Sequence, residues 1–330
     1  MTEGIACARA GLLGNPSDGY FGRIIAVAVR NFRARVTLEE SPEIVIVPAA
    51  EDEERYASLE EFARGTFLYG YYGGVRLAKA AVKKFHDYVR DSGQRLPARN
   101  FTLRYESDIP RQIGLAGSSA IITATLRALM AFYGIDIPRE VQPSLILSAE
   151  RDELDINAGF MDRVIQVYEG CVFMDLDETL LRAAGHGRYE PLDPALLPPL
   201  YLAYKPALGK VSGRVLNEIR VKYDRGDAFT IGVLRKLGEL AERGRRALLD
   251  GDQDTFIRLM DENFELRRSI QEISPSNQEM IAAARACGAS AKYAGSGGSI
   301  IGALRGEAMW GDVRRALERV GAVVLRPRIV

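Results

Sequence analysis

The sequence contains few of the residues that several large classes of active site require. It has two histidines, His86 and His186, and three widely spaced cysteines, Cys7, Cys171 and Cys287. No CxxC pair and no Cys/His cluster with zinc spacing is present. These shortages argue against a site with several histidine ligands and against a serine–histidine–aspartate triad. The odd, scattered cysteines favour a reducing compartment in which the thiols are buried and free.

A charge excess and long apolar runs are also missing. Lys+Arg and Asp+Glu both number 44, so the formal net charge is zero. Proteins that bind nucleic acid or anionic membranes usually carry a basic excess. No window holds 18 consecutive apolar residues, and the first ten residues lack the features of a signal peptide. We therefore expect a cytoplasmic enzyme or binding protein without a nucleic-acid or membrane partner; the oligomeric state stays open.

The length of 330 residues suits about two domains. Five prolines between Pro191 and Pro206 predict the crossing, which gives domains at 1–190 and 191–330. Strands and helices are mixed in both parts, so the sequence predicts an α+β protein with two lobes. Strands are expected at 24–29, 34–38, 44–47, 100–106, 299–304 and 322–326, and the stretch 164–173 is expected to lead into a further strand. Helices are expected at 59–90, 118–133, 143–152, 230–249, 255–270, 278–287 and 309–320.

The strongest chemical signal is the segment Pro-Arg-Gln-Ile-Gly-Leu-Ala-Gly-Ser-Ser-Ala at 110–120, between a predicted strand and an apolar helix. Glycines allow the backbone to approach a ligand closely, and a helix start favours phosphate. The hydroxyls of Ser118 and Ser119 suit a phosphate oxygen or Mg²⁺. The alternative is a tight turn with serine caps. Neither a Walker A pattern nor GxGxxG follows a strand, so the standard nucleotide loops do not account for the segment.

Two further glycine segments lie at 9–19 and 295–298, and three such loops would suit one shared site. Carboxylates are dense at 149–163, where Glu150 falls late in a helix and Asp162 begins the next one. Phosphoryl transfer needs one carboxylate for Mg²⁺ and a group that orients the attacking hydroxyl. A helix cap or an ion pair is the alternative for Asp162. For Asp152, Glu153 and Asp155 a solvated face is favoured.

In this order, the stretches 9–18, 110–120 and 292–298, which contain the three glycine segments, resemble the three motifs of the GHMP kinases. That resemblance implies a ribosomal protein S5 domain 2-like N-terminal lobe and a ferredoxin-like C-terminal lobe. Within the superfamily the sequence resembles the plant glucuronokinases. It shares their strings Leu-Gly-Asn-Pro-Ser-Asp, Tyr-Tyr-Gly-Gly-Val-Arg-Leu, Ile-Pro-Arg-Gln-x-Gly-Leu-x-Gly-Ser-Ser-Ala-Ile and Asp-Arg-Val-x-Gln-Val-Tyr, at 13–18, 71–77, 109–121 and 162–168.

The resemblance implies an ATP- and Mg²⁺-dependent kinase that phosphorylates the anomeric hydroxyl of D-glucuronic acid to give glucuronate 1-phosphate. One alternative is a GHMP kinase for a different sugar, sugar acid or polyol. Another is a sensor with this fold that binds a nucleotide or metabolite without transfer. The joint presence of Ser119, Glu150 and Asp162 argues against the sensor, which needs no catalytic carboxylate.

The resemblance also implies roles for individual residues. Asp162 would be the catalytic aspartate, with Arg9 beside the transferred phosphate, and Ser119 and Glu150 would hold Mg²⁺. A substrate carboxylate calls for an arginine, for which Arg111, Arg163 and Arg30 are candidates. The residues that would bind ATP are Gly114, Ala116, Gly117, Ser118 and Ser119. Those that would line the substrate side of the active site are Asp18, Gly295, Ser296, Gly297 and Gly298.

Two departures from the family pattern affect this assignment. Cys7 and Ala8 stand where the first motif usually has Pro-Gly, and the third motif is shorter than Gly-Ala-Gly-x-Gly-Gly.

Overall fold

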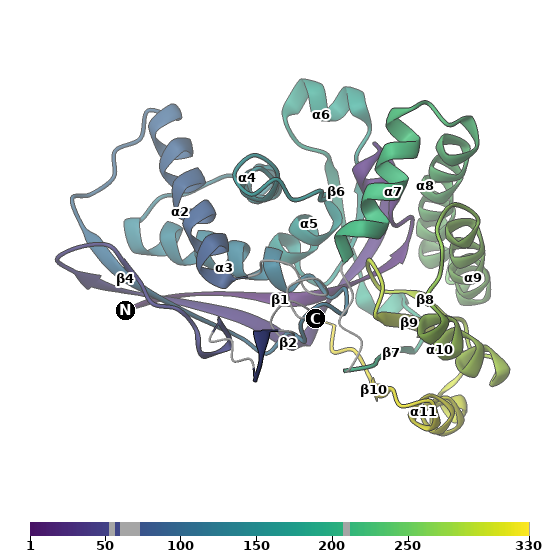
Figure 1. The fold of residues 1–330 in the computed structure, drawn as a ribbon. Coiled ribbons are helices and arrows are strands. Elements are labelled where there is room, and N and C mark those ends of the chain that lie inside the picture. The colour runs from purple at the N-terminus through teal and green to yellow at the C-terminus, as the bar shows by residue number, and fades with distance from the viewer. Residues whose placement is uncertain (53–56, 60–72, 207–211, 330) are drawn as a thin grey trace.

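The computed structural model describes residues 1–52, 57–59, 73–206 and 212–329, and its helices and strands form an α+β protein with two sheets (Figure 1). The first sheet has the order β3-β4-β2-β5-β6, and β1 pairs with β2. All its pairings are antiparallel except that of β3 with β4. Its strands are β1 (Thr2–Leu13), β2 (Arg23–Ser41), β3 (Val45–Ile46), β4 (Asn100–Ser107), β5 (Cys171–Asp175) and β6 (Arg188–Leu192).

The long strand β2 corrects the prediction of two separate strands at 24–29 and 34–38. Its C-terminal half pairs with β4 and its N-terminal end pairs with β5. The register with β1 jumps, because Cys7 lies opposite Arg33 while Ala8 lies opposite Val29. The polar residues between the two predicted strands therefore form a bulge in one continuous strand, and a bulge interrupts the apolar pattern without ending the pairing.

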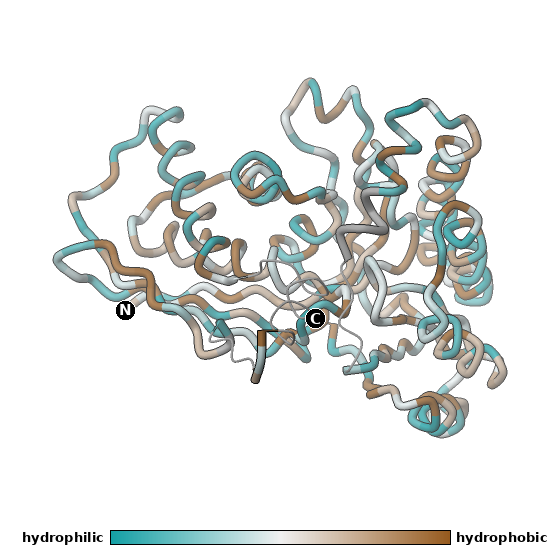
Figure 2. The backbone as a smooth tube through the Cα atoms, in the orientation of Figure 1, coloured by the Kyte–Doolittle hydropathy of each residue, from teal (hydrophilic) through white to brown (hydrophobic). Residues whose placement is uncertain are grey.

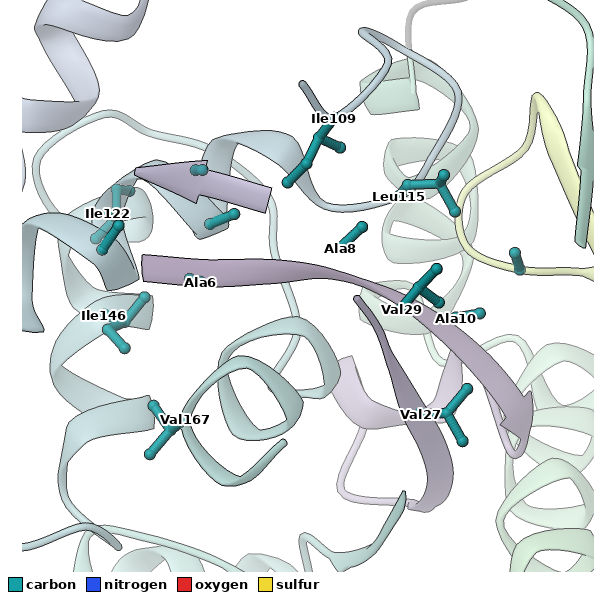
Figure 3. Close-up of a cluster of buried hydrophobic side chains, with 14 of the residues drawn as sticks. Ala6, Ala8, Ala10, Val27, Val29, Ile109, Leu115, Ile122, Ile146 and Val167 are labelled. Atoms are coloured by element: carbon teal, nitrogen blue, oxygen red, sulfur yellow. The ribbon is translucent and has the colours of Figure 1, made fainter. Parts of the chain in front are cut away.

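Helices cover one face of the first sheet: α2 (Gly74–Asp91), α3 (Gly117–Tyr133), α4 (Gln142–Arg151) and α5 (Met161–Tyr168). Strand β1 lies directly against α3, because a Cβ on Gly4 would collide with the backbone at Ala124. Small side chains at Ala6, Ala8 and Ala10 continue this close packing within the main core (Figure 3). Residues 60–72, which include Phe67 of the predicted helix at 59–90, lie outside the described part of the chain.

The second sheet is antiparallel and has the order β10-β7-β9-β8. Its strands are β7 (Leu200–Tyr204), β8 (Lys292–Tyr293), β9 (Ser299–Ala303) and β10 (Val323–Leu325). The other helices are α6 (Glu178–Ala184), α7 (Ser212–Asp224), α8 (Ala228–Leu249), α9 (Gln253–Ile270), α10 (Pro275–Ala286) and α11 (Trp310–Arg319), with short 3₁₀ turns η1 (Ser17–Gly19), η2 (Ala50–Asp52), η3 (Pro194–Leu196) and η4 (Glu307–Met309). Neither α6 nor α7 was predicted from the sequence.

The main core runs from the first sheet into the C-terminal helices. Gly244 of α8 allows that helix to approach Leu13 and Ile25 of the first sheet. The strands β1, β2 and β4 carry long hydrophobic stretches, whereas the outer turns of the helices are largely hydrophilic (Figure 2). The chain passes between the sheets at 193–199, and the predicted division at 190/191 falls inside β6. Among the described residues, no helix is long and apolar enough to span a membrane.

Candidate active site

The structure brings the three glycine segments side by side, although they lie far apart in the sequence, at 9–19, 110–120 and 295–298. The amide of Gly11 donates to the carbonyl of Ala294 at 2.7 Å. The amide of Arg9 donates to the carbonyl of Leu115 at 3.3 Å. The hydroxyl of Ser299 donates to the carbonyl of Ile113 at 2.7 Å. Strand β1, the loop before α3 and the loop before β9 thus share one junction.

Two glycines at this junction are required by close backbone contacts. Gly114 has φ of 71°, and a Cβ there would lie 2.6 Å from the carbonyl oxygen of Gly297. A Cβ on Gly295 would collide with the carbonyl oxygen of Gly114 and lie 2.5 Å from Nη1 of Arg9. Because any side chain would push the two loops apart, glycine at both positions fits a site built from backbone.

The loop before α3 has the geometry of an anion-binding turn. Positive φ recurs at alternate residues: 59° at Gln112, 71° at Gly114 and 65° at Ala116, which is the N-cap of α3. Such alternation points successive N–H groups toward one side, and the start of a helix adds its positive dipole end. Left-handed backbone costs about 1 kcal/mol at a non-glycine residue, so its occurrence at Gln112 and Ala116 points to a functional loop.

A chain of alternating charges runs from β1 to the start of α3. Nε of Arg9 lies 2.5 Å from Oδ1 of Asp162, and Oδ2 of Asp162 lies 3.4 Å from Nη1 of Arg163. Arg163 continues the chain by donating to Oε2 of Glu150, at 2.5 Å from Nε. The other oxygen of Glu150 lies 3.5 Å from the hydroxyl of Ser118. Residues far apart in sequence therefore form one network, in which Glu150 is fully buried.

The two carboxylates of this network have opposite pKa shifts. Burial raises the pKa of Glu150, and the guanidinium of Arg163 opposes that rise without cancelling it. Burial acts on Asp162 in the same direction, but the positive charges of Arg9 and Arg163 outweigh it and hold the pKa of Asp162 below its usual value. Asp162 is therefore ionised at neutral pH and is held in place from both sides.

Asp18, in the turn η1, lies against the backbone just before Asp162. Its Oδ2 accepts the amide of Met161 at 3.1 Å, and a Cβ on Gly159 would collide with the Asp18 carboxylate. Burial and the negative charge of Asp162 raise the pKa of Asp18, although the bond from Met161 opposes the rise. The first segment thus places a second carboxylate beside Asp162, and the role of Asp18 as a sugar contact stays a prediction.

The two serines of the motif point in different directions. Ser118 faces Glu150, whereas the fully buried Ser119 donates its hydroxyl to the carbonyl of Ala116 at 3.2 Å. The role of Ser119 as a metal ligand stays a prediction, and of the two hydroxyls that the sequence offered, only that of Ser118 lies near Glu150. No group of three or more His, Cys, Asp or Glu side chains suited to a metal occurs among the described residues.

The three arginines predicted to read a substrate carboxylate are not brought together. Each side-chain nitrogen of Arg163 already has a partner, namely Glu150, Asp162 or the carbonyl of Gly159. Arg111 lies 3.5 Å from Asp52 with 45% of its side chain exposed. Arg30 lies 2.8 Å from Glu169 on the surface. For Arg163, a structural ion pair accounts for every nitrogen.

Two buried cations from the C-terminal part were not singled out by the sequence analysis. Lys292 donates to the carbonyls of Gly11 and Tyr293 and, at 2.6 Å, to Oδ1 of Asn15. Burial, together with the charges of Arg267 and Arg9, lowers its pKa well below the usual value. Arg267 donates to the carbonyl of Gly295 at 2.7 Å. Lys292 opens the stretch 292–298 that resembles the third motif, and this position was the one sequence signal that pointed to it.

Comparisons with known proteins agree with this arrangement. The chain matches the GHMP kinases N terminal domain over residues 76–170. Phosphomevalonate kinase from Streptococcus pneumoniae, solved with phosphomevalonate and AMPPNP, superimposes with a TM-score of 0.79 at 16% identity over the whole of both chains. Lactococcus lactis galactokinase, solved with galactose, gives 0.74 at 16% identity over 99% of this chain and 93% of that chain. The fold and motifs are those of a GHMP kinase, which confirms the predicted α+β fold.

The particular family follows from sequence. The chain is 44% identical over 300 residues to glucuronokinase 1 from Arabidopsis thaliana, covering 89% of this chain and 82% of the relative. Probable glucuronokinase 2 of the same plant is also 44% identical, over 301 residues. The chain therefore belongs to the glucuronokinase family of GHMP kinases and is an ATP-dependent phosphotransferase.

Proposed function

We propose that the chain transfers the γ-phosphoryl group of ATP to the anomeric hydroxyl of D-glucuronic acid, giving glucuronate 1-phosphate and ADP. The observation that carries the proposal is the 44% identity to glucuronokinase 1, which spans 82% of that relative. The buried pair of Arg9 and Asp162 at the junction of the three segments supports it, because phosphoryl transfer depends mainly on positioning and charge.

In this proposal the loop before α3 binds the phosphates of ATP. The backbone N–H groups of residues 114–118 and the hydroxyl of Ser118 face the nucleotide, as the alternating backbone geometry at Gln112, Gly114 and Ala116 favours. Gly117 begins the helix and keeps its first turn open to a close approach.

The residues present fit a magnesium ion held jointly with the nucleotide. Glu150 offers a carboxylate oxygen next to the hydroxyl of Ser118, and Mg²⁺ commonly takes one or two protein oxygens together with phosphate and water. Ser119 keeps its predicted role as a ligand, which requires its hydroxyl to turn away from Ala116. When bound, the ion would offset the charge of the phosphates.

Asp162 accepts a hydrogen bond from the anomeric hydroxyl and aligns the hydroxyl oxygen with the γ-phosphorus of ATP. The new bond forms between that oxygen and phosphorus, the bond from phosphorus to the bridging oxygen of ADP breaks, and the hydroxyl proton passes to Asp162. Arg9 fixes the carboxylate through Nε and brings positive charge to the transferring group. Asp18 and the segment at Gly295–Gly297 bind the sugar through groups other than the hydroxyl that faces Asp162.

The alternative is a GHMP kinase for another sugar, sugar acid or polyol, which would use the same Asp162 and Glu150. A panel of candidate acceptors, assayed by ADP release with and without Mg²⁺, separates the two. We expect kcat/KM to be highest for D-glucuronate and activity to disappear in EDTA. A higher kcat/KM for a neutral sugar would favour the alternative. ATP binding without turnover of any acceptor would favour a sensor.

We assign the reaction to the cytoplasm. Cys7, Cys171 and Cys287 are all free in the structure, and a reducing compartment keeps such thiols unpaired.

A further inference from the structure

Helix α7 brings an arginine to the turn that carries Asp18. Nη2 of Arg220 donates to the carbonyl of Gly19 at 2.8 Å. A Cβ placed on Gly19 would lie 3.4 Å from the same nitrogen, so the contact is direct. Figure 1 shows α7 standing next to α8, on the side of the molecule that contributes the third glycine segment. Arg220 thus joins the C-terminal helices to the residue that follows the predicted sugar contact.

Aromatic packing fixes the position of the Arg220 guanidinium. Its central carbon lies 4.3 Å from the ring centre of Tyr20 and 5.8 Å from that of Tyr223. The two tyrosine rings pack together with their centres 4.7 Å apart. Stacking of this kind holds the planar group in one orientation while leaving its edge available for a planar anion.

The charge of Arg220 is only weakly compensated. Its carboxylate neighbour, Asp224, lies 3.7 Å from Nη1 on the same helix, and the Asp224 side chain is 59% exposed. Exposed pairs of this kind contribute little. Asp18, the other carboxylate nearby, is committed to the amide of Met161.

Arg163 and Arg220 both lie near enough to Arg151 for their charges to act on it. Burial and the positive charges of Arg163 and Arg220 lower the pKa of Arg151. Arg151 donates to the carbonyl of Ala158, and Arg163 is bonded to Glu150. Arg163 is paired with a carboxylate and Arg151 bonds to a carbonyl in the loop after its own helix, whereas Arg220 reaches across to the turn that carries Asp18.

We infer that Arg220 is the specificity-determining residue that binds the carboxylate of the uronic acid. The inference rests on the proposed function and assigns one of its recognition contacts. A guanidinium can donate two parallel hydrogen bonds to a carboxylate, and a sugar with a neutral group at that position would lose them. The bond to the carbonyl of Gly19 places this cation next to the turn that carries Asp18.

The test compares Arg220→Gln and Arg220→Lys with the wild-type enzyme on D-glucuronate and on its neutral amide, D-glucuronamide. The amide is measured as a substrate or as a competitive inhibitor. For Arg220→Gln we expect kcat/KM on glucuronate to fall about 10- to 150-fold, mainly through KM, as loss of a hydrogen bond between charged groups predicts. Arg220→Lys should recover part of this loss. The constants for the amide and the KM for ATP should change less than threefold.

Arg225→Gln is the matched control, because it removes an exposed arginine just beyond the end of the same helix. It should behave as wild type. An Arg220→Gln enzyme that is as active as wild type on glucuronate would overturn the inference, and so would an equal loss on the amide, which would show that Arg220 only supports the turn. A wild-type enzyme that does not phosphorylate glucuronate would overturn the proposed function first and the inference with it.

Discussion

Replacing Asp162 with asparagine tests the central pair of the site while keeping the shape of the side chain. The carboxylate lies 2.5 Å from Nε of Arg9 and 3.4 Å from Nη1 of Arg163, so the substitution removes the charge that both guanidinium groups face. Positioned acid–base groups typically contribute about 10²- to 10⁴-fold to rate. We therefore expect kcat to fall by about that factor, with the Kd for ATP within about threefold, because the phosphate loop is untouched.

The same substitution has a calculable effect on stability. Breaking a buried ion pair from one side costs about 3–5 kcal/mol. Asparagine keeps one oxygen acceptor, and 16% of the Asp162 side chain is exposed, so the lower end applies. With an unfolding entropy of about 2.1 cal/mol/K per residue, a loss of about 3 kcal/mol lowers Tm by about 4 °C if the chain unfolds as one unit.

The pH dependence of this loss has a definite sign. The folded-state pKa of Asp162 is lowered, so its contribution to stability is fully present above the unfolded value of about 3.9 and is lost as pH falls through the folded value. The difference in unfolding free energy between wild type and Asp162→Asn should therefore be constant from neutral pH down to about pH 4 and shrink below it.

Single-turnover kinetics, nucleotide titration and thermal melts at several pH values measure these three effects. Asp155→Asn, an exposed aspartate in the preceding loop, is the control and should leave all three unchanged. An Asp162→Asn enzyme with wild-type kcat would refute the assigned role. A stability difference that grows as pH falls would refute the electrostatic account of the pair.

Three further predictions concern the neighbouring groups. Ser118→Ala should raise the half-saturating Mg²⁺ concentration about tenfold. Ser119→Ala should raise it less, because, of the two serines, only Ser118 faces Glu150. Equal effects of the two variants in a Mg²⁺ titration would contradict this prediction. Asp18→Asn should lower kcat/KM for the sugar at least tenfold. It should also raise the free energy of unfolding by about 1 kcal/mol, because the raised pKa of Asp18 means that its charged form destabilises the fold above about pH 4. A thermal melt at neutral pH that shows no gain in stability would count against this electrostatic cost. Lys292→Met should lower Tm by about 4 °C, because its three acceptors would lose their donor, and an unchanged Tm would exclude that bonding role.

The helices that the sequence predicted well are those with a strong local signal. The apolar run that becomes α3 and the periodic segments that become α8 and α9 were placed within a few residues of their observed ends. In the structure, aspartate caps begin α8 and α9, since Asp227 and Asp252 each accept an amide in the first turn of the helix that follows. Strand β2 was divided in the prediction because a bulge and the end of a strand present the same polar gap.

The residues of the site were easier to predict than their contacts. The motifs pointed to Arg9 and Asp162, but no pattern in the sequence shows that two side chains 153 positions apart form an ion pair. Lys292, Arg267 and Arg220 were missed for the same reason. A basic side chain that donates to carbonyls of another segment looks, in sequence, like any surface lysine or arginine, and only the fold brings it beside its acceptors.

The adjacent serines of the phosphate loop show where this limit is sharpest. Successive residues of a helix are rotated by about 100°, so Ser118 and Ser119 point in different directions. The motif contains both hydroxyls and does not indicate which of them lies next to Glu150. In the fold, α4 places Glu150 on the side of Ser118, while the turn at Ala116 takes the hydroxyl of Ser119. The packing of α4 against α3 therefore sets which hydroxyl lies next to Glu150, and the Mg²⁺ titration of the two alanine variants tests whether that hydroxyl is the one that binds the proposed ion.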